Sequence, residues 1–189
     1  MTGAMHIFRP SVPEGYEWAV PTDSGDLEVI RALGERPPGG PWTPIPMALL
    51  KVDEHGQSQK RSDLPWLGGH VLVLRDEAIE AVGEILRPHG ELLPLVCDEA
   101  RLALFSAPVV QGVLDEARSD MVRFGSGRIM ALRTPAFRRS ALGGRGAFRL
   151  AEMPRGDLYL TGHVVEAIRS TGMTAGTHFT LAYGEGSES

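Results

Sequence analysis

The sequence predicts an α+β fold built from short antiparallel strands and about four helices. Three observations support this fold class. Hydrophobic residues make up 42% of the 189 residues, which is enough to form the core of an ordinary domain. The 14 prolines and 23 glycines interrupt the chain often, so its helices and strands must be short. Segments with a helical spacing of apolar residues are mixed with strand-like apolar runs along the whole chain.

Residues 1–60 are expected to form an irregular N-terminal subdomain. A strand is predicted over 6–9, and a helix from Asp26, where apolar residues recur three apart until Gly34 ends the pattern. Residues 36–46 contain five prolines, which exclude both a helix and a central strand. This segment is therefore predicted to be an extended connector.

Residues 61–184 are expected to form the main α+β domain, followed by a flexible tail over 185–189. Its helices are predicted over 76–86 with Asp76 as N-cap, over 109–117, and from a Thr161 cap to Gly172. Strands are predicted over 92–96, 101–105, 121–124, 128–133, 148–150, 158–160 and 178–182. The third and fourth of these strands flank Gly125-Ser126-Gly127, which indicates a hairpin.

The cysteine count and the N-terminus indicate a cytoplasmic location. Cys97 is the only cysteine, so no internal disulfide and no tetrahedral thiolate zinc site can form within one chain. The N-terminus lacks the basic and apolar regions of a secretory signal. The apolar runs are far shorter than the roughly 20 residues that cross a bilayer. We therefore expect no membrane partner.

The motifs that could carry catalysis are weak. Gly125-Ser126-Gly127 lacks the outer spacing of a hydrolase elbow, and Gly143-Gly-Arg-Gly146 leads into a predicted strand instead of a phosphate-binding helix. Cys97 is followed by two acidic residues, which would raise the pKa of a thiol. The six histidines lack the spacing of metal ligands. We expect no catalytic residue, no metal and no cofactor.

Positive charge is concentrated in one part of the chain. Residues 118–155 contain nine arginines and only Asp120 and Glu152 as acids, whereas 76–99 contains seven acids and one arginine. Arginine is enriched where proteins bind one another, so the candidate partner-binding residues include Arg123, Arg128, Arg133, Arg138 and Arg139. Alternatively, these arginines form a solvated face and pair with the acidic helix. The chain is acidic overall, which argues against nucleic acid as a partner.

Trp66 is the sixth candidate for partner binding. It lies in a segment bounded by glycines just before the predicted helix at 76–86. A tryptophan in such a loop either covers the core or anchors an interface, and both alternatives stay open at this point.

The segment Ser62-Asp-Leu-Pro-Trp-Leu-Gly-Gly-His70, continued to residue 82 and followed by Arg87-Pro-His-Gly-Glu-Leu-Leu-Pro-Leu95, resembles a known family. It is similar to an immunity-protein family of bacterial polymorphic toxin systems, formerly a domain of unknown function. Shorter similar segments follow in the family's order to about residue 180. The resemblance implies a protein that neutralises a cognate toxin protein by binding it in a fixed ratio. The alternative is an uncharacterised enzyme or an anion-binding module that uses the arginine-rich surface.

Overall fold

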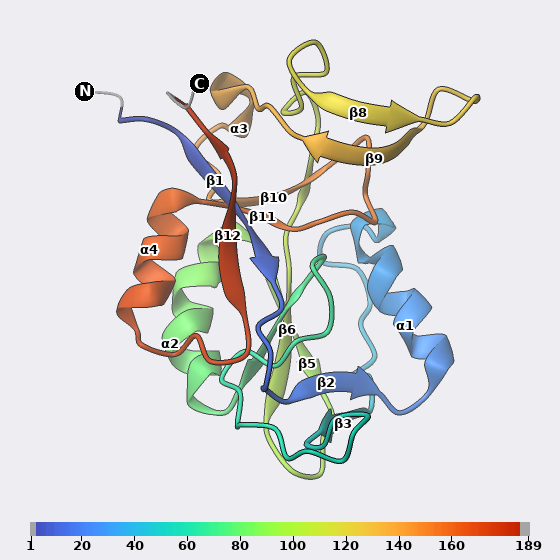
Figure 1. Ribbon diagram of the computed structural model, residues 1–189, viewed down its shortest axis with the longest axis vertical. Coiled ribbons are helices and arrows are strands. Elements are labelled where there is room, and N and C mark those ends of the chain that lie inside the picture. The colour runs from blue at the N-terminus through green and yellow to red at the C-terminus, as the bar shows by residue number, and fades with distance from the viewer. Residues whose placement is uncertain (1–2, 186–189) are drawn as a thin grey trace.

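The computed structural model describes residues 3–185 and confirms the α+β fold class predicted from the sequence (Figure 1). Its α-helices are α1 (Ser24–Arg31), α2 (Glu77–Leu86), α3 (Arg139–Leu142) and α4 (Gly162–Ser170). Short 3₁₀ helices, η1 (Ala32–Glu35) and η2 (Arg87–His89), follow α1 and α2. The strands are β1 (His6–Ser11), β2 (Trp18–Pro21), β3 (Met47–Leu50), β4 (Leu72–Arg75), β5 (Glu91–Leu95), β6 (Leu102–Ser106), β7 (Val109–Val110), β8 (Asp120–Arg123), β9 (Ile129–Thr134), β10 (Ala147–Leu150), β11 (Tyr159–Thr161) and β12 (His178–Gly184).

The largest sheet joins both ends of the described chain. Its strand order is β12-β1-β11-β10-β7, and every neighbouring pair is antiparallel except β7 and β10. Strand β1 therefore lies between two strands from the C-terminal part of the chain. Residues 19–49 also share a core with β4, β5 and β6. The boundary expected near residue 60 thus does not separate two hydrophobic cores.

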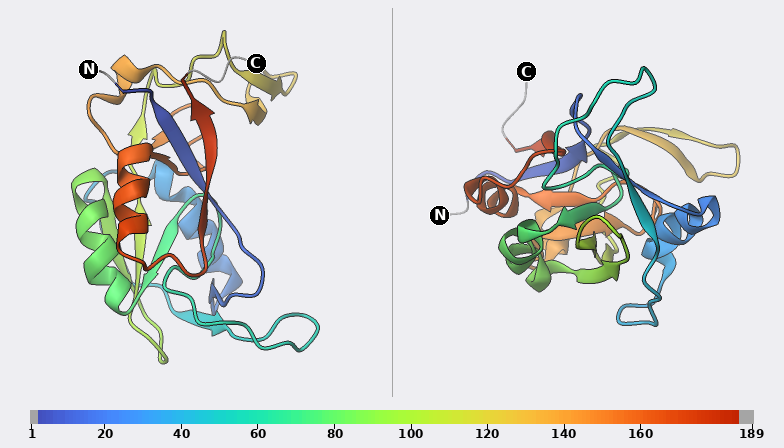
Figure 2. Two further views of the ribbon diagram at one scale, coloured as in Figure 1. Left: turned by 60° about the vertical axis from the view of Figure 1, so that its left-hand side comes forward. Right: turned by 90° about the horizontal axis from the view of Figure 1, so that it is seen from below.

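A second sheet has the strand order β4-β6-β5, and helices α2 and α4 pack against residues of both sheets. Figure 2 shows these two helices side by side, and one apolar cluster contains residues of both helices and of both sheets. Val82 on α2 and Val165 on α4 are both completely buried in this cluster. Burial of such side chains stabilises the fold by about 1.5–3 kcal/mol each.

Two small sheets lie at opposite ends of the molecule. Strands β2 and β3 pair antiparallel at the lower end of Figure 1, and β8 pairs with β9 at the upper end. The hairpin of β8 and β9 was predicted from its sequence and is confirmed. Strands β2, β3 and β4 and the short helix α3 were not predicted.

The helix predicted over 109–117 is wrong. Val109 and Val110 form β7, which pairs in parallel with Arg149 and Leu150. Gly112 then has a φ of +73°, a left-handed conformation that no helix continues through. The apolar residues that suggested a helix enter one core cluster from a strand and a turn instead.

Helices α2 and α4 are confirmed, and Asp76 and Thr161 hold their predicted N-cap positions, but neither side chain makes a capping hydrogen bond. Asp76 has a φ of +49° and makes no capping hydrogen bond. Its carboxylate instead accepts hydrogen bonds from Arg61 Nη2 at 3.1 Å and from the backbone N–H of Arg101 at 3.0 Å. Thr161 precedes α4, but its hydroxyl bonds to His163 Nδ1 at 2.9 Å and leaves the helix uncapped.

Candidate functional site

The arginine-rich hairpin of β8 and β9 is the least buried part of the sheet structure. No residue of either strand is fully buried, and Met121, Ile129 and Leu132 alone are among the apolar residues packed against the core. The turn is closed by a hydrogen bond from Phe124 N to Arg128 O at 2.9 Å. Figure 1 shows the hairpin projecting at the upper end of the molecule.

We define the hairpin surface as Arg123, Phe124, Arg128, Met130 and Arg133. Arg123 donates to Glu116 at 2.5 Å and to Gly127 O at 2.6 Å. The guanidinium of Arg128 lies over the ring of Phe124, 5.7 Å from its centre.

The hairpin surface also contains an arginine without an acidic partner among the described residues and two exposed apolar side chains. Arg133 is exposed, and its side chain makes no ion pair or hydrogen bond within residues 3–185. Phe124 and Met130 have exposed fractions of 44% and 49%, which is high for large apolar side chains. Arginine, aromatic residues and methionine are the types enriched at protein interfaces. The hairpin surface therefore combines free positive charge with exposed apolar area.

Arg138 and Arg139 are not part of this surface. Arg138 pairs with Asp115 at 3.4 Å, just before α3. Arg139 donates to Gly3 O at 2.6 Å and pairs with Glu185 at 2.8 Å, so it links the two ends of the described chain. The five predicted arginines are thus divided between two places in the fold.

Trp66 lies far from the arginines, at the other end of the molecule. It forms an isolated bridge with Trp18 of β2, and its carbonyl accepts a hydrogen bond from Ala19 N at 2.9 Å. Trp66 is half-buried, whereas Trp18 is 42% exposed and pairs across the sheet with Leu50, which is 44% exposed. Trp18 was missed, because its buried neighbours Glu17 and Ala19 do not give the alternation of apolar and polar residues by which a strand is recognised.

The pairing of the acidic helix with the arginine-rich block is not found within residues 3–185. Glu80 of α2 pairs with Arg101 at 2.7 Å, and Glu77 pairs with Arg61 at 3.5 Å. The hydrogen bonds from Arg101 lower the pKa of Glu80. Within the block, Arg155 pairs instead with Glu35 at 2.9 Å, next to α1. The acidic helix therefore supplies no counter-charge to the hairpin surface, where only Arg123 has a carboxylate partner, Glu116, among the described residues.

Arg149 was counted in the positive block but is completely buried. Its Nη1 lies 3.5 Å from Pro154 O, and its Nε and Nη2 have no hydrogen-bond partner among the described residues. Burial lowers the pKa of Arg149 to about 10. His70 is close enough that burial, with the charges of Arg149 and Arg31, lowers its pKa to about 4. The sequence carries no local signal for this burial.

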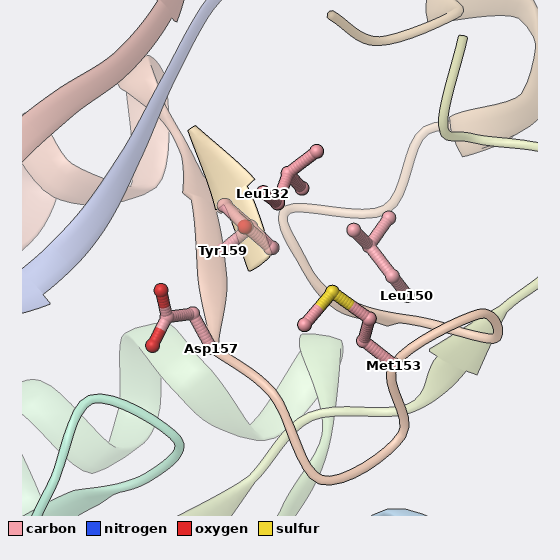
Figure 3. A pocket seen from close by; sticks show the side chains of 5 residues that line it. All are labelled: Leu132, Leu150, Met153, Asp157 and Tyr159. Atoms are coloured by element: carbon pink, nitrogen blue, oxygen red, sulfur yellow. The ribbon is translucent and has the colours of Figure 1, made fainter. Parts of the chain in front are cut away.

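A small cavity lies beneath the hairpin, lined by Leu132, Leu150, Met153, Asp157 and Tyr159 (Figure 3). Its volume is about 60 Å³, enough for a few waters and well below the ~300 Å³ of small ligand pockets. Burial raises the pKa of Asp157, and the Arg9 side chain at 3.4 Å partly offsets this. Burial and the Asp157 charge raise the pKa of Tyr159. Tyr159 packs in an apolar core cluster, and Asp157 pairs with Arg9.

The residues considered for catalysis are dispersed. Cys97 is half-buried against the core of β4, β5 and β6, and Ser126 is exposed in the hairpin turn. Over residues 3–185, no three His, Cys, Asp or Glu side chains are grouped so that they could hold a metal ion. No helix in the same range has both the length and the apolar character needed to cross a bilayer.

Comparison with protein-family models gives no match to this chain, and comparison with curated proteins gives no significant match.

Proposed function

We propose that this chain is a cytoplasmic immunity protein that binds a cognate toxin protein and neutralises it by occlusion. The resemblance of residues 62–95 to an immunity-protein family is the origin of this proposal. The observation that carries it in the fold is the hairpin surface. There Arg128 and Arg133 have no carboxylate partner among the described residues, beside exposed Phe124 and Met130.

The hairpin surface favours an acidic protein as the partner. An exposed arginine without a counter-charge attracts carboxylates and speeds the encounter with an acidic face. Phe124 and Met130 supply apolar area that loses water on contact, which adds affinity that charge alone does not give. Charge at the edge and apolar area beside it together form the pattern of a protein-binding surface.

An enzyme is the less favoured alternative. The candidate nucleophiles Cys97 and Ser126 line neither the cavity of about 60 Å³ at Tyr159 nor the larger groove of about 360 Å³ between α3 and α4. A nucleophile needs a base within about 3 Å and room for a substrate. The hairpin surface therefore supports binding better than catalysis.

Co-expression with the toxin region encoded by the neighbouring gene tests the proposal. We expect the chain to restore growth and to co-purify with the toxin in a fixed ratio, because occlusion requires one surface per toxin. Growth restored with no complex, measured by size-exclusion chromatography with light scattering, would contradict occlusion and indicate an enzymatic antagonist.

A further inference from the structure

A groove of about 360 Å³ lies where the N-terminal end of α4 meets α3 and the start of β1. Figure 1 shows these three elements on one side of the molecule, on the opposite side from the hairpin tip. Side chains from four separate segments line it: His6, Arg139, Arg145 and His163. This volume falls within the range of small-molecule sites, about 300–1,000 Å³.

The glycine-rich turn at residues 143–146 forms one wall of the groove. In sequence this turn leads into β10, so it does not precede a helix of its own. The fold brings it to the start of a different helix, since Thr161 N donates to Gly146 O at 2.9 Å. A Cβ on Gly146 would lie 2.4 Å from Val164 Cγ2, so only glycine permits this approach. The turn and the α4 N-terminus thus form one continuous wall.

Positive charge dominates the groove. Arg145 has no carboxylate partner among the described residues and donates only to Leu142 O, at 3.3 Å. Arg139 is partly neutralised by Glu185 at 2.8 Å. His6 and His163 are both exposed beside these arginines. Because Glu185 pairs only with Arg139 within residues 3–185, the basic side chains in the groove outnumber the acidic ones.

The first turn of α4 adds to this preference for an anion. The Thr161 hydroxyl bonds to His163 Nδ1 and does not cap the helix, so it leaves the N–H groups of that turn to other acceptors. The helix dipole also favours negative charge at this end. Leu142 and Met5, with exposed fractions of 5% and 7%, line the same groove as buried apolar side chains.

We propose that this groove binds a small phosphorylated molecule, with Arg145 and Arg139 paired to phosphate oxygens and the apolar area at Leu142 contacting its carbon part. Guanidinium groups match phosphate geometry with two parallel hydrogen bonds. The site is separate from the hairpin surface, so it does not depend on toxin binding.

Phenyl phosphate is the probe, titrated by calorimetry into the full chain at constant ionic strength, with inorganic phosphate and benzyl alcohol as partial probes. We expect saturable binding of phenyl phosphate, weaker binding of phosphate and none of the alcohol. Arg145→Gln should weaken phenyl phosphate binding at least tenfold. The matched control Arg133→Gln, which removes an equal charge from the hairpin, should change it less than twofold.

Arg145→Lys separates a binding role from a folding role, since it keeps the charge and loses the planar fork. It should weaken binding by an intermediate factor while the melting temperature stays unchanged. Absence of saturable binding to the wild type, or equal weakening by Arg145→Gln and Arg133→Gln, would overturn the proposal. Absence of saturable binding would show that the groove is not a binding site. Equal weakening by the two variants would show that only the net charge of the protein attracts the probe.

Discussion

Arg75 and Glu17 form a buried ion pair that joins the N-terminal segment to β4. The exposed fractions of the two residues are 9% and 5%. Glu17 also accepts a hydrogen bond from Ser62 N at 3.3 Å, and Ser62 Oγ donates to Glu17 O at 2.8 Å. The pair therefore ties residues before the proline-rich connector to the main sheet.

Removing Glu17 should destabilise the protein, because the buried Arg75 then keeps only Asp76, 3.2 Å from its Nε, as a counter-charge. We expect Glu17→Gln to lower the free energy of unfolding by about 3 kcal/mol in urea denaturation. The matched control Glu14→Gln, at an exposed position, should change it by less than about 0.5 kcal/mol. Equal effects of the two substitutions would show that the pair adds no stability.

Arg149 should behave in the opposite way, because it is a buried cation without a carboxylate partner among residues 3–185. Replacing a buried charge with an apolar side chain of similar length is often neutral or stabilising. We expect Arg149→Met to be at least as stable as the wild type, and Arg149→Ala to be less stable by about 2 kcal/mol because it leaves a cavity. A loss above about 2 kcal/mol in Arg149→Met would show that the guanidinium makes stabilising bonds.

The lowered pKa of His70 predicts that the protein loses stability in acid. Its pKa is lowered from 6.5 to about 4 in the folded protein, so the unfolded chain binds the proton first as the pH falls. The contribution of neutral His70 to the free energy of unfolding is complete above pH 6.5. It is lost between pH 6.5 and 4, by roughly 3 kcal/mol at most. His70→Phe should flatten the dependence of unfolding free energy on pH in this window.

His55 provides the control for this measurement, since its side chain is 75% exposed. His55→Phe should leave the pH dependence of the wild type unchanged. If His70→Phe showed the wild-type slope between pH 6.5 and 4, other groups, the carboxylates or His89, whose pKa burial also lowers, would account for the loss.

Cys97 tests whether a thiol takes part in protection. Cys97 lies half-buried against apolar residues, and its thiol makes no hydrogen bond among residues 3–185. Cys97→Ser should leave growth protection intact and lower the free energy of unfolding by about 1 kcal/mol or less. Lost protection with an unchanged melting temperature would instead assign the thiol a chemical role.

The elements with a local pattern could be predicted from the sequence. The apolar face of α2, the glycine turn between β8 and β9, and the strands at β1, β10, β11 and β12 each carry their own signal. Strand β7 could not be predicted, because only its parallel partner Arg149–Leu150, 40 residues later, decides its conformation. Strands β2 and β3 likewise depend on each other across the proline-rich connector.

The candidate site was predicted only in part, for the same reason. Arg123, Arg128 and Arg133 follow from the hairpin pattern. The partners of Arg138 and Arg139, Asp115 and Glu185, are 23 and 46 residues away in sequence, so no local pattern shows the pairing. The acidic helix does not neutralise the block, since Arg61 and Arg101 pair with two of its carboxylates, Glu77 and Glu80.

The association rate of a hairpin variant with the toxin tests the central claim most directly. Arg128→Glu with Arg133→Glu reverses the two arginines that lack a carboxylate partner among the described residues. We expect about thirtyfold slower association at low salt, from about 1 kcal/mol per reversal, and a smaller difference at high salt. Lys60→Glu with Arg87→Glu makes the same change in net charge at exposed positions off the hairpin and should alter the rate less than threefold. Equal rates for the two double variants, at an unchanged melting temperature, would contradict the hairpin surface as the toxin-binding site.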